Sequence, residues 1–190
     1  MTPHKAFHWL AAASIVCLTL LNLPAKAWEM TGSKTILLHG RDGQAVPVGT
    51  VNFEPKGDKI TFSVKMDPAL LKNYFLSMRE FKCIEGAGEI LCHVPYPYAS
   101  PATVSASDFA WLEHSLLFLF NRPKDFGAKL WNGLYYRLKL TDQGLVGLPE
   151  AIDLNQISTP HADLSVPPYG PDERSEIAPD TRWFNKLTIE

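Results

Sequence analysis

The segment KITFSVKM, residues 59–66, alternates strictly between apolar and polar side chains. Because successive side chains of a strand point to opposite faces, this period of two predicts a strand with one buried face and one solvated face. The segment KLWNGLYYRLKLT, residues 129–141, returns to the same period. Weaker extended patterns, bounded by turns that contain glycine, predict further strands over residues 34–39, 46–54 and 145–154.

Two segments lose this alternation and follow a helical pattern instead. Asp67 and Pro68 are typical of a helix start, because aspartate caps the first turn and proline fits its first position. The apolar residues after them predict a short helix over residues 68–75. The segment ASDFAWLEHSLLFLF, residues 106–120, is apolar nearly all round a helical projection, which predicts a longer helix buried in the core.

Cys83 and Cys92 lie on two alternating segments that are separated by a Gly-Ala-Gly turn. In a hairpin centred on Ala87 and Gly88 the two cysteines face each other, and opposed Cβ atoms come within reach of a disulfide. A zinc site needs about four ligands and finds only His93 nearby, and a redox pair is normally Cys-x-x-Cys at a helix start. The spacing therefore favours a structural cross-strand disulfide over a metal site or a redox pair.

Together these elements predict a single domain of the α+β class. We expect an antiparallel β-sheet of about six to seven strands with one short and one longer buried helix, because short connections favour antiparallel pairing. The domain is expected over residues 28–155. Residues 156–190 are rich in proline and acidic side chains and predict a surface tail, although its end, RWFNKLTIE, is apolar enough to dock on the domain.

The first 27 residues form a separate unit. A basic start is followed by an apolar run over residues 9–23 and by small residues up to Ala27. This pattern is typical of a secretory signal peptide, and we predict cleavage between Ala27 and Trp28. An uncleaved membrane anchor and a lipid anchor on Cys17 are the alternatives. The run is shorter than the about 20 residues that a span needs and it continues past Cys17, so cleavage is favoured.

Cleavage also changes the charge. It removes two lysines and no acidic residue, which leaves 16 basic side chains against 20 acidic ones and takes the net charge from −2 to −4. A mildly acidic chain without a basic block is a poor partner for nucleic acid. Since a disulfide needs an oxidising compartment, we expect a periplasmic or secreted protein with no stable membrane span after cleavage.

Catalytic chemistry has little support in the sequence, which contains no motif that assigns catalytic roles. Glu113 and His114 are adjacent on the predicted longer helix and point about 100° apart, so one face cannot present both to a metal ion. We predict no metal site and no cofactor. An envelope hydrolase or metal-dependent enzyme that uses His93 or the Glu113/His114 pair is kept as the alternative function.

Paired carboxylates are a weaker indication of catalysis. Glu80, Glu85 and Glu89 flank the predicted hairpin. Acidic side chains are almost never fully buried unless they are paired, so we expect all three to be solvated.

Aromatic residues give the one positive indication of function. Tyr96 and Tyr98 lie in an irregular proline-rich loop beside the hairpin, Tyr135 is on the more polar face of its strand, and Arg79 is nearby in sequence. Tyrosines held by rigid backbone are favoured contact residues, and the alternative is that they pack over the open end of the core. We expect a non-catalytic binding or interaction protein that uses these four residues to bind an envelope protein, a peptide or a small ligand.

Overall fold

The computed structural model describes residues 28–190. The predicted signal peptide, with Ala27 and Cys17, lies outside the described residues. From Trp28 to the end, the chain forms one 12-stranded sheet in which every neighbouring pair is antiparallel. The strands are β1 (Gly32–Gly40), β2 (Ala45–Lys56), β3 (Lys59–Met66), β4 (Lys72–Phe75), β5 (Glu80–Gly86), β6 (Glu89–His93), β7 (Thr103–Val104), β8 (Phe118–Asn121), β9 (Gly133–Thr141), β10 (Gly144–Ile152), β11 (Ser175–Glu176) and β12 (Phe184–Ile189).

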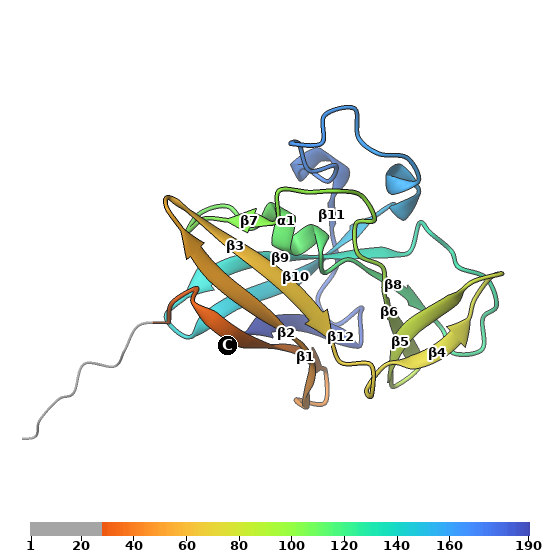
Figure 1. The fold of residues 1–190 in the computed structure, drawn as a ribbon. Helices are drawn as coiled ribbons and strands as arrows, with labels where there is room; N and C mark the ends of the chain where they lie inside the picture. The colour runs from red at the N-terminus through yellow and green to blue at the C-terminus, as the bar shows by residue number, and fades with distance from the viewer. Residues whose placement is uncertain (1–27) are drawn as a thin grey trace, which may run out of the picture.

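The strands follow the order β4-β5-β6-β8-β9-β10-β12-β1-β2-β3-β7, and the short β11 pairs with β10 beside this path. The sheet curls, so that β1 to β3 form one side, β4 to β6 and β8 form the other, and β9 and β10 run between them (Figure 1). Helical structure is limited to α1 (Ala110–His114) and two 3-10 turns, η1 (Leu154–Ile157) and η2 (Pro171–Glu173).

The predicted α+β class with about six to seven strands and a longer helix is therefore wrong. The helix predicted over residues 106–120 ends at His114, and the apolar residues after it form β8 between β6 and β9. Phe118 packs in one buried cluster and Leu119 in another, so β8 is buried on both faces. A strand buried on both faces is as continuously apolar as a buried helix, and periodicity does not separate the two.

The short helix predicted over residues 68–75 is also wrong. The Asp67 carboxylate accepts a hydrogen bond from the Ala69 N–H, as a cap does, but the chain makes only one turn. Residues 72–75 then become β4, which pairs with β5 at one edge of the sheet. The tertiary pairing overrides the local helix signal.

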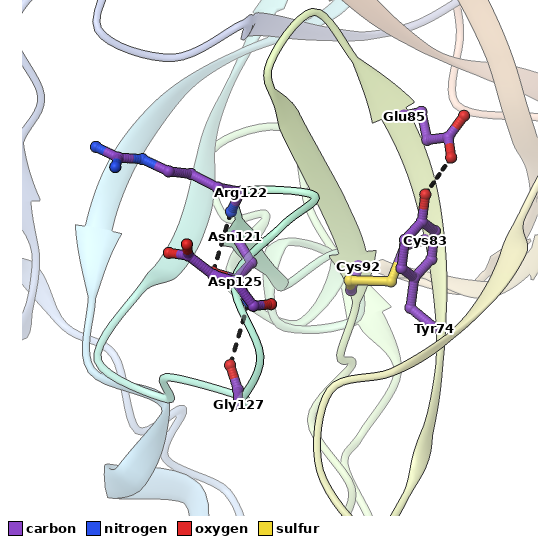
Figure 2. The surroundings of a disulfide bond; sticks show 8 residues. All are labelled: Tyr74, Cys83, Glu85, Cys92, Asn121, Arg122, Asp125 and Gly127. Carbon is purple, nitrogen blue, oxygen red and sulfur yellow. Dashed lines mark hydrogen bonds between the residues drawn. A yellow bond between two sulfur atoms is a disulfide. The ribbon is translucent and has the colours of Figure 1, made fainter.

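The predicted hairpin and its disulfide are confirmed. Cys83 pairs with Cys92 across β5 and β6 and the two form a disulfide bond, which Figure 2 shows. Gly88 has a φ of 76°, the left-handed conformation that the turn requires and that glycine adopts without strain. The predicted strand over residues 59–66 coincides with β3.

Two buried clusters support the sheet. The larger one, here called the main core, includes Ile36, Phe53, Tyr136 and Leu187. The smaller one, here called the disulfide core, lies on the other face of β6, β8 and β9. Its buried members are Leu76, Cys83, Ile90, Cys92, Leu117, Leu119, Tyr135, Ile152, Leu154, Ile157 and Tyr169.

The end of the chain has a larger role than docking. Residues 184–189 form β12, which lies between β10 and β1 and carries the buried Leu187 and Ile189. The predicted tail thus contributes an interior strand, and the segment before it packs across the disulfide core through Tyr169. Among residues 28–190 there is no helix with the length and apolar character needed to cross a bilayer.

Candidate functional site

The residues predicted for binding do not form one exposed surface. Arg79 and Pro97 border a groove of about 380 Å³, here called the Arg79 groove, with Phe81, His93, Leu130 and Ile157. Tyr98 lies beside it and donates a hydrogen bond from its hydroxyl to the Ser158 carbonyl, 2.8 Å away. This bond ties the proline-rich loop to the turn after β10.

Tyr96 is half-buried and packs inward. Its ring lies 5.4 Å from the Tyr98 ring, 6.0 Å from Trp111 and 6.2 Å from His114, measured between centroids. The Tyr96 hydroxyl is buried without a hydrogen-bond partner. These contacts agree better with the alternative that Tyr96 and Tyr98 pack over the core than with an exposed contact site.

Tyr135 lies in the disulfide core and is only 1% exposed, so the expectation that it stands on a solvated face is wrong. Its hydroxyl donates a hydrogen bond to the Glu113 carboxylate, and the Arg174 guanidinium lies 4.7 Å from its ring centroid. The pattern of β9 suggested a wet face because Arg137 and Lys139 share it, but α1 and the segment around Tyr169 cover its first half.

Glu113 and His114 are buried and hydrogen-bonded inside the fold. Glu113 also accepts a hydrogen bond from the Leu138 N–H at 2.6 Å. Burial raises the pKa of its carboxyl, and the hydrogen bond from Tyr135 opposes that shift. Neither residue lines the Arg79 groove.

The ring of His114 joins two distant segments. Its Nε2 accepts a hydrogen bond from the Tyr169 N–H at 3.1 Å, so Nδ1 carries the proton and donates to the Ala110 carbonyl at 2.6 Å. Burial lowers the pKa of His114 to about 4, which keeps the ring neutral. A neutral ring with both nitrogens bonded has no free position for a metal ion or a proton transfer.

The remaining histidines lie apart from one another. His93 Nε2 is bonded to the Ser115 carbonyl at 2.9 Å, and His39 Nε2 lies 2.8 Å from the Thr188 hydroxyl. Burial lowers the pKa of both rings. In the described part of the chain, no three His, Cys, Asp or Glu side chains lie close enough together to hold a metal ion.

A second hollow, which the sequence did not indicate, lies beside the turn between β5 and β6. The turn between β5 and β6 meets the segment 181–183 that leads into β12, and a cleft of about 510 Å³ lies between them, the end of β8 and the loop after it. We call this hollow the Arg182 cleft. Its basic residues are Arg41, Arg122, Lys129 and Arg182, and its acidic residues are Glu89 and Asp125.

Glu89 and Arg182 face each other in this cleft. Arg182 Nη1 lies 3.2 Å from Glu89 Oε2, and the guanidinium stacks 3.7 Å from the centroid of the Phe120 ring. Glu89 is only 7% exposed, so the expectation that it is solvated is wrong. Burial raises the pKa of its carboxyl, whereas the charge of Arg182 and the backbone N–H groups of Trp183 and Phe184 oppose that shift.

The hydrogen bonding of this pair is incomplete. Glu89 Oε1 is buried without a hydrogen-bond partner, and the buried Arg182 Nη1 lies beside Glu89 Oε2 as an ion pair but makes no hydrogen bond. Buried polar groups are nearly always satisfied, and each exception needs an explanation such as a missing ligand. The pair therefore leaves one acceptor and one donor at the floor of the cleft without a hydrogen bond.

The wall of the cleft is held in place by close packing. The Trp183 ring lies against the backbone of Gly86, where a Cβ atom would come within 2.1 Å of the ring, and it also contacts Gly40. A glycine is needed at position 86 for this approach. The Arg41 guanidinium lies 5.7 Å from the centroid of the Trp183 ring and donates a hydrogen bond to the Asp180 carbonyl at 2.6 Å.

The opposite wall is shaped by the buried side chain of Asn121. Its amide donates to the carbonyls of Asp125 and Gly127, and its oxygen accepts a hydrogen bond from the Arg122 N–H (Figure 2). These three bonds fix the loop that carries Arg122, whose side chain extends away from the disulfide. The rim of the cleft thus rests on an ordered loop.

Sequence reasoning missed this cleft because its residues come from distant segments. Arg41, Glu89 and Arg182 are brought together only by the curl of the sheet, so no local spacing reveals them. The one available signal was the apolar end of the chain, where an arginine and a tryptophan precede the last strand. Comparison with known proteins finds no matching family model, no similar curated protein and no similar solved structure.

Proposed function

We propose that this chain is an exported, non-catalytic binding protein that holds a small polar ligand in the Arg182 cleft. The observation that carries the proposal is the unsatisfied pair at the floor, Glu89 Oε1 and Arg182 Nη1. A ligand that bonds to both atoms would remove a deficit that is otherwise unfavourable by about 1–3 kcal/mol per group. The volume of about 510 Å³ is within the range of clefts that hold small molecules.

Export is supported by the signal-peptide pattern of residues 1–27 and by the disulfide, since disulfides persist in the periplasm and outside the cell. A non-catalytic role is supported by the positions of the residues that the alternative, an enzyme, would use. His93, Glu113 and His114 are each hydrogen-bonded within the fold, and none of them lines the Arg182 cleft.

The proposal is tested by calorimetric titration of the purified mature protein with glucose, glucuronic acid, glutamate, lysine, triglycine and inorganic phosphate. We expect at least one of these compounds to bind the wild type. Trp131→Ala should weaken its binding about tenfold, because this ring borders the cleft and is 65% exposed, so that its loss leaves the core intact.

Phe75→Ala is the matched control, because Phe75 is 66% exposed and lies on β4, outside the cleft. Its binding should equal that of the wild type. Failure of every compound to bind, or equal binding by the Trp131 variant, would overturn the proposal. Conversion of a bound compound into a product would contradict the non-catalytic assignment.

A further inference from the structure

The floor of the Arg182 cleft offers one hydrogen-bond acceptor and one donor side by side. Glu89 Oε1 can accept a hydrogen bond, and Arg182 Nη1, which is ion-paired with Glu89 Oε2 but makes no hydrogen bond, can donate one. A ligand carboxylate would be attracted by Arg182 but repelled by Glu89. A ligand ammonium group would be attracted by Glu89 but repelled by Arg182. A hydroxyl group both donates and accepts, so it satisfies both atoms at once. Both atoms are shielded from water.

The rim of the cleft carries an excess of positive charge. Lys129 is paired with Asp125 at 3.1 Å, and Arg182 is paired with Glu89. Within residues 28–190 no acidic side chain forms an ion pair with Arg41 or Arg122, although both line the cleft. Two guanidinium groups without acidic partners favour a ligand that carries a carboxylate or a phosphate, which they hold by charge-assisted hydrogen bonds.

One aromatic face in the cleft is free. The Phe120 ring is covered by Arg182 and the Trp183 ring by Arg41. Trp131 is 65% exposed, and among the described residues no aromatic ring or cation stacks on it. A large, rigid aromatic surface at a cleft packs against the flat apolar face of a ligand.

We infer that the Arg182 cleft binds an acidic saccharide, that is, a sugar that carries a carboxylate or a phosphate group. Sugar rings combine the three required features: hydroxyl groups at the edge for Glu89 and Arg182, a flat face of C–H groups for Trp131, and an anionic substituent for Arg41 and Arg122. This inference rests on the proposed function and adds the chemical class of its ligand.

The inference is tested by calorimetric titration with trigalacturonic acid, glucose 1-phosphate, maltotriose and inorganic phosphate. We expect one of the two acidic sugars to bind at least about tenfold more tightly than maltotriose and than inorganic phosphate. Which acidic sugar binds distinguishes a carboxylate from a phosphate. Raising the salt concentration should weaken the binding of the acidic sugar and leave the binding of maltotriose unchanged, because salt screens only the charge attraction.

Arg122→Ala separates the roles of the rim and the floor. This variant should bind the acidic sugar about tenfold more weakly and maltotriose with unchanged affinity. Glu89→Gln should bind both sugars more weakly. Arg79→Ala is the matched control, because Arg79 is an exposed arginine that lines the other groove. It should change neither affinity.

Equal binding of acidic and neutral sugars, or equal binding of inorganic phosphate and the acidic sugars, would overturn the inference. Binding of a compound that is not a sugar, in the absence of any sugar binding, would overturn the inference and leave the proposed function standing. No binding by any compound in either series would overturn both.

Discussion

Glu113 and Glu89 are two buried glutamates in very different surroundings. They are 6% and 7% exposed, and burial raises the pKa of both carboxyls. Both oxygens of Glu113 accept hydrogen bonds, from Tyr135 and from the Leu138 N–H, within a closed core. Glu89 faces an open cleft with Oε1 unpartnered. Burial and a raised pKa are therefore common to both carboxylates, and the two differ in whether each oxygen has a hydrogen-bond partner.

The largest expected effect tests the structural member of the pair. Glu113→Ala leaves the Tyr135 hydroxyl and the Leu138 N–H unsatisfied in the core, which should lower the free energy of unfolding by about 3–5 kcal/mol. Urea denaturation measures this change. Glu176→Ala, an exposed glutamate on β11, should change it by less than about 0.5 kcal/mol. A loss below about 1 kcal/mol for Glu113→Ala would contradict the assignment.

The next effect concerns His114, beside Glu113. Its pKa falls from 6.5 in the unfolded chain to about 4 in the folded protein, so on acidification the unfolded chain takes up this proton first. The contribution of His114 to stability is complete above about pH 6.5 and declines by about 3 kcal/mol as the pH falls to about 4. Glu113 and Glu89 act in the opposite direction, because their raised pKa values favour the folded protein in acid.

Comparison with His114→Gln isolates the contribution of the histidine. Glutamine can donate to the Ala110 carbonyl and accept from the Tyr169 N–H without titrating. Urea denaturation from pH 7.5 to pH 4 should show the wild type losing about 3 kcal/mol relative to this variant. Parallel curves for the two proteins would show that His114 is not held neutral.

The disulfide gives a third, smaller effect, in the region that holds Glu89. Replacement of Cys83 and Cys92 by alanine releases the hairpin whose turn forms one wall of the cleft. For a closed loop of about ten residues, the loss should be about 2–3 kcal/mol in the chain-entropy model. Urea denaturation of the oxidised wild type and the double variant measures it. An unchanged midpoint would mean that the sheet pairing alone holds the hairpin.

The smallest effect on stability tests the binding member of the comparison. Glu89→Ala removes a carboxylate whose burial is only partly compensated, and water in the cleft can then solvate Arg182, so stability should change by no more than about 1 kcal/mol. Urea denaturation measures this change beside that of Glu113→Ala. Equal losses in the two variants would show that the two glutamates play the same structural role.

The sequence predicted well the features that depend on local pattern. The strand predicted from the alternation of residues 59–66 was confirmed as β3. The predicted pairing of Cys83 with Cys92 was confirmed as a disulfide across the β5–β6 hairpin. Both follow from a side-chain period of two, which neighbouring residues display by themselves.

Features that depend on distant pairing were missed. The segment after His114 is apolar because β8 is covered on both faces, by elements that its own residues do not reveal. Tyr135 and Glu89 were expected to be exposed, but both are buried. Residues of the predicted tail lie against them: Arg174 against Tyr135 and Arg182 against Glu89. The Arg182 cleft is missed for the same reason, since the curl of the sheet creates it.

The position of β12 has a consequence for how the protein folds. Its residues pair with β1, and Ile189 lies opposite Ile36, so the pairing joins segments far apart in the sequence. Neither β1 nor β10 can complete its hydrogen bonding until β12 lies between them. Contacts this distant in sequence slow folding. The sheet is therefore expected to be completed late in folding, when β12 joins the strand pair β9–β10 to the meander β1–β3.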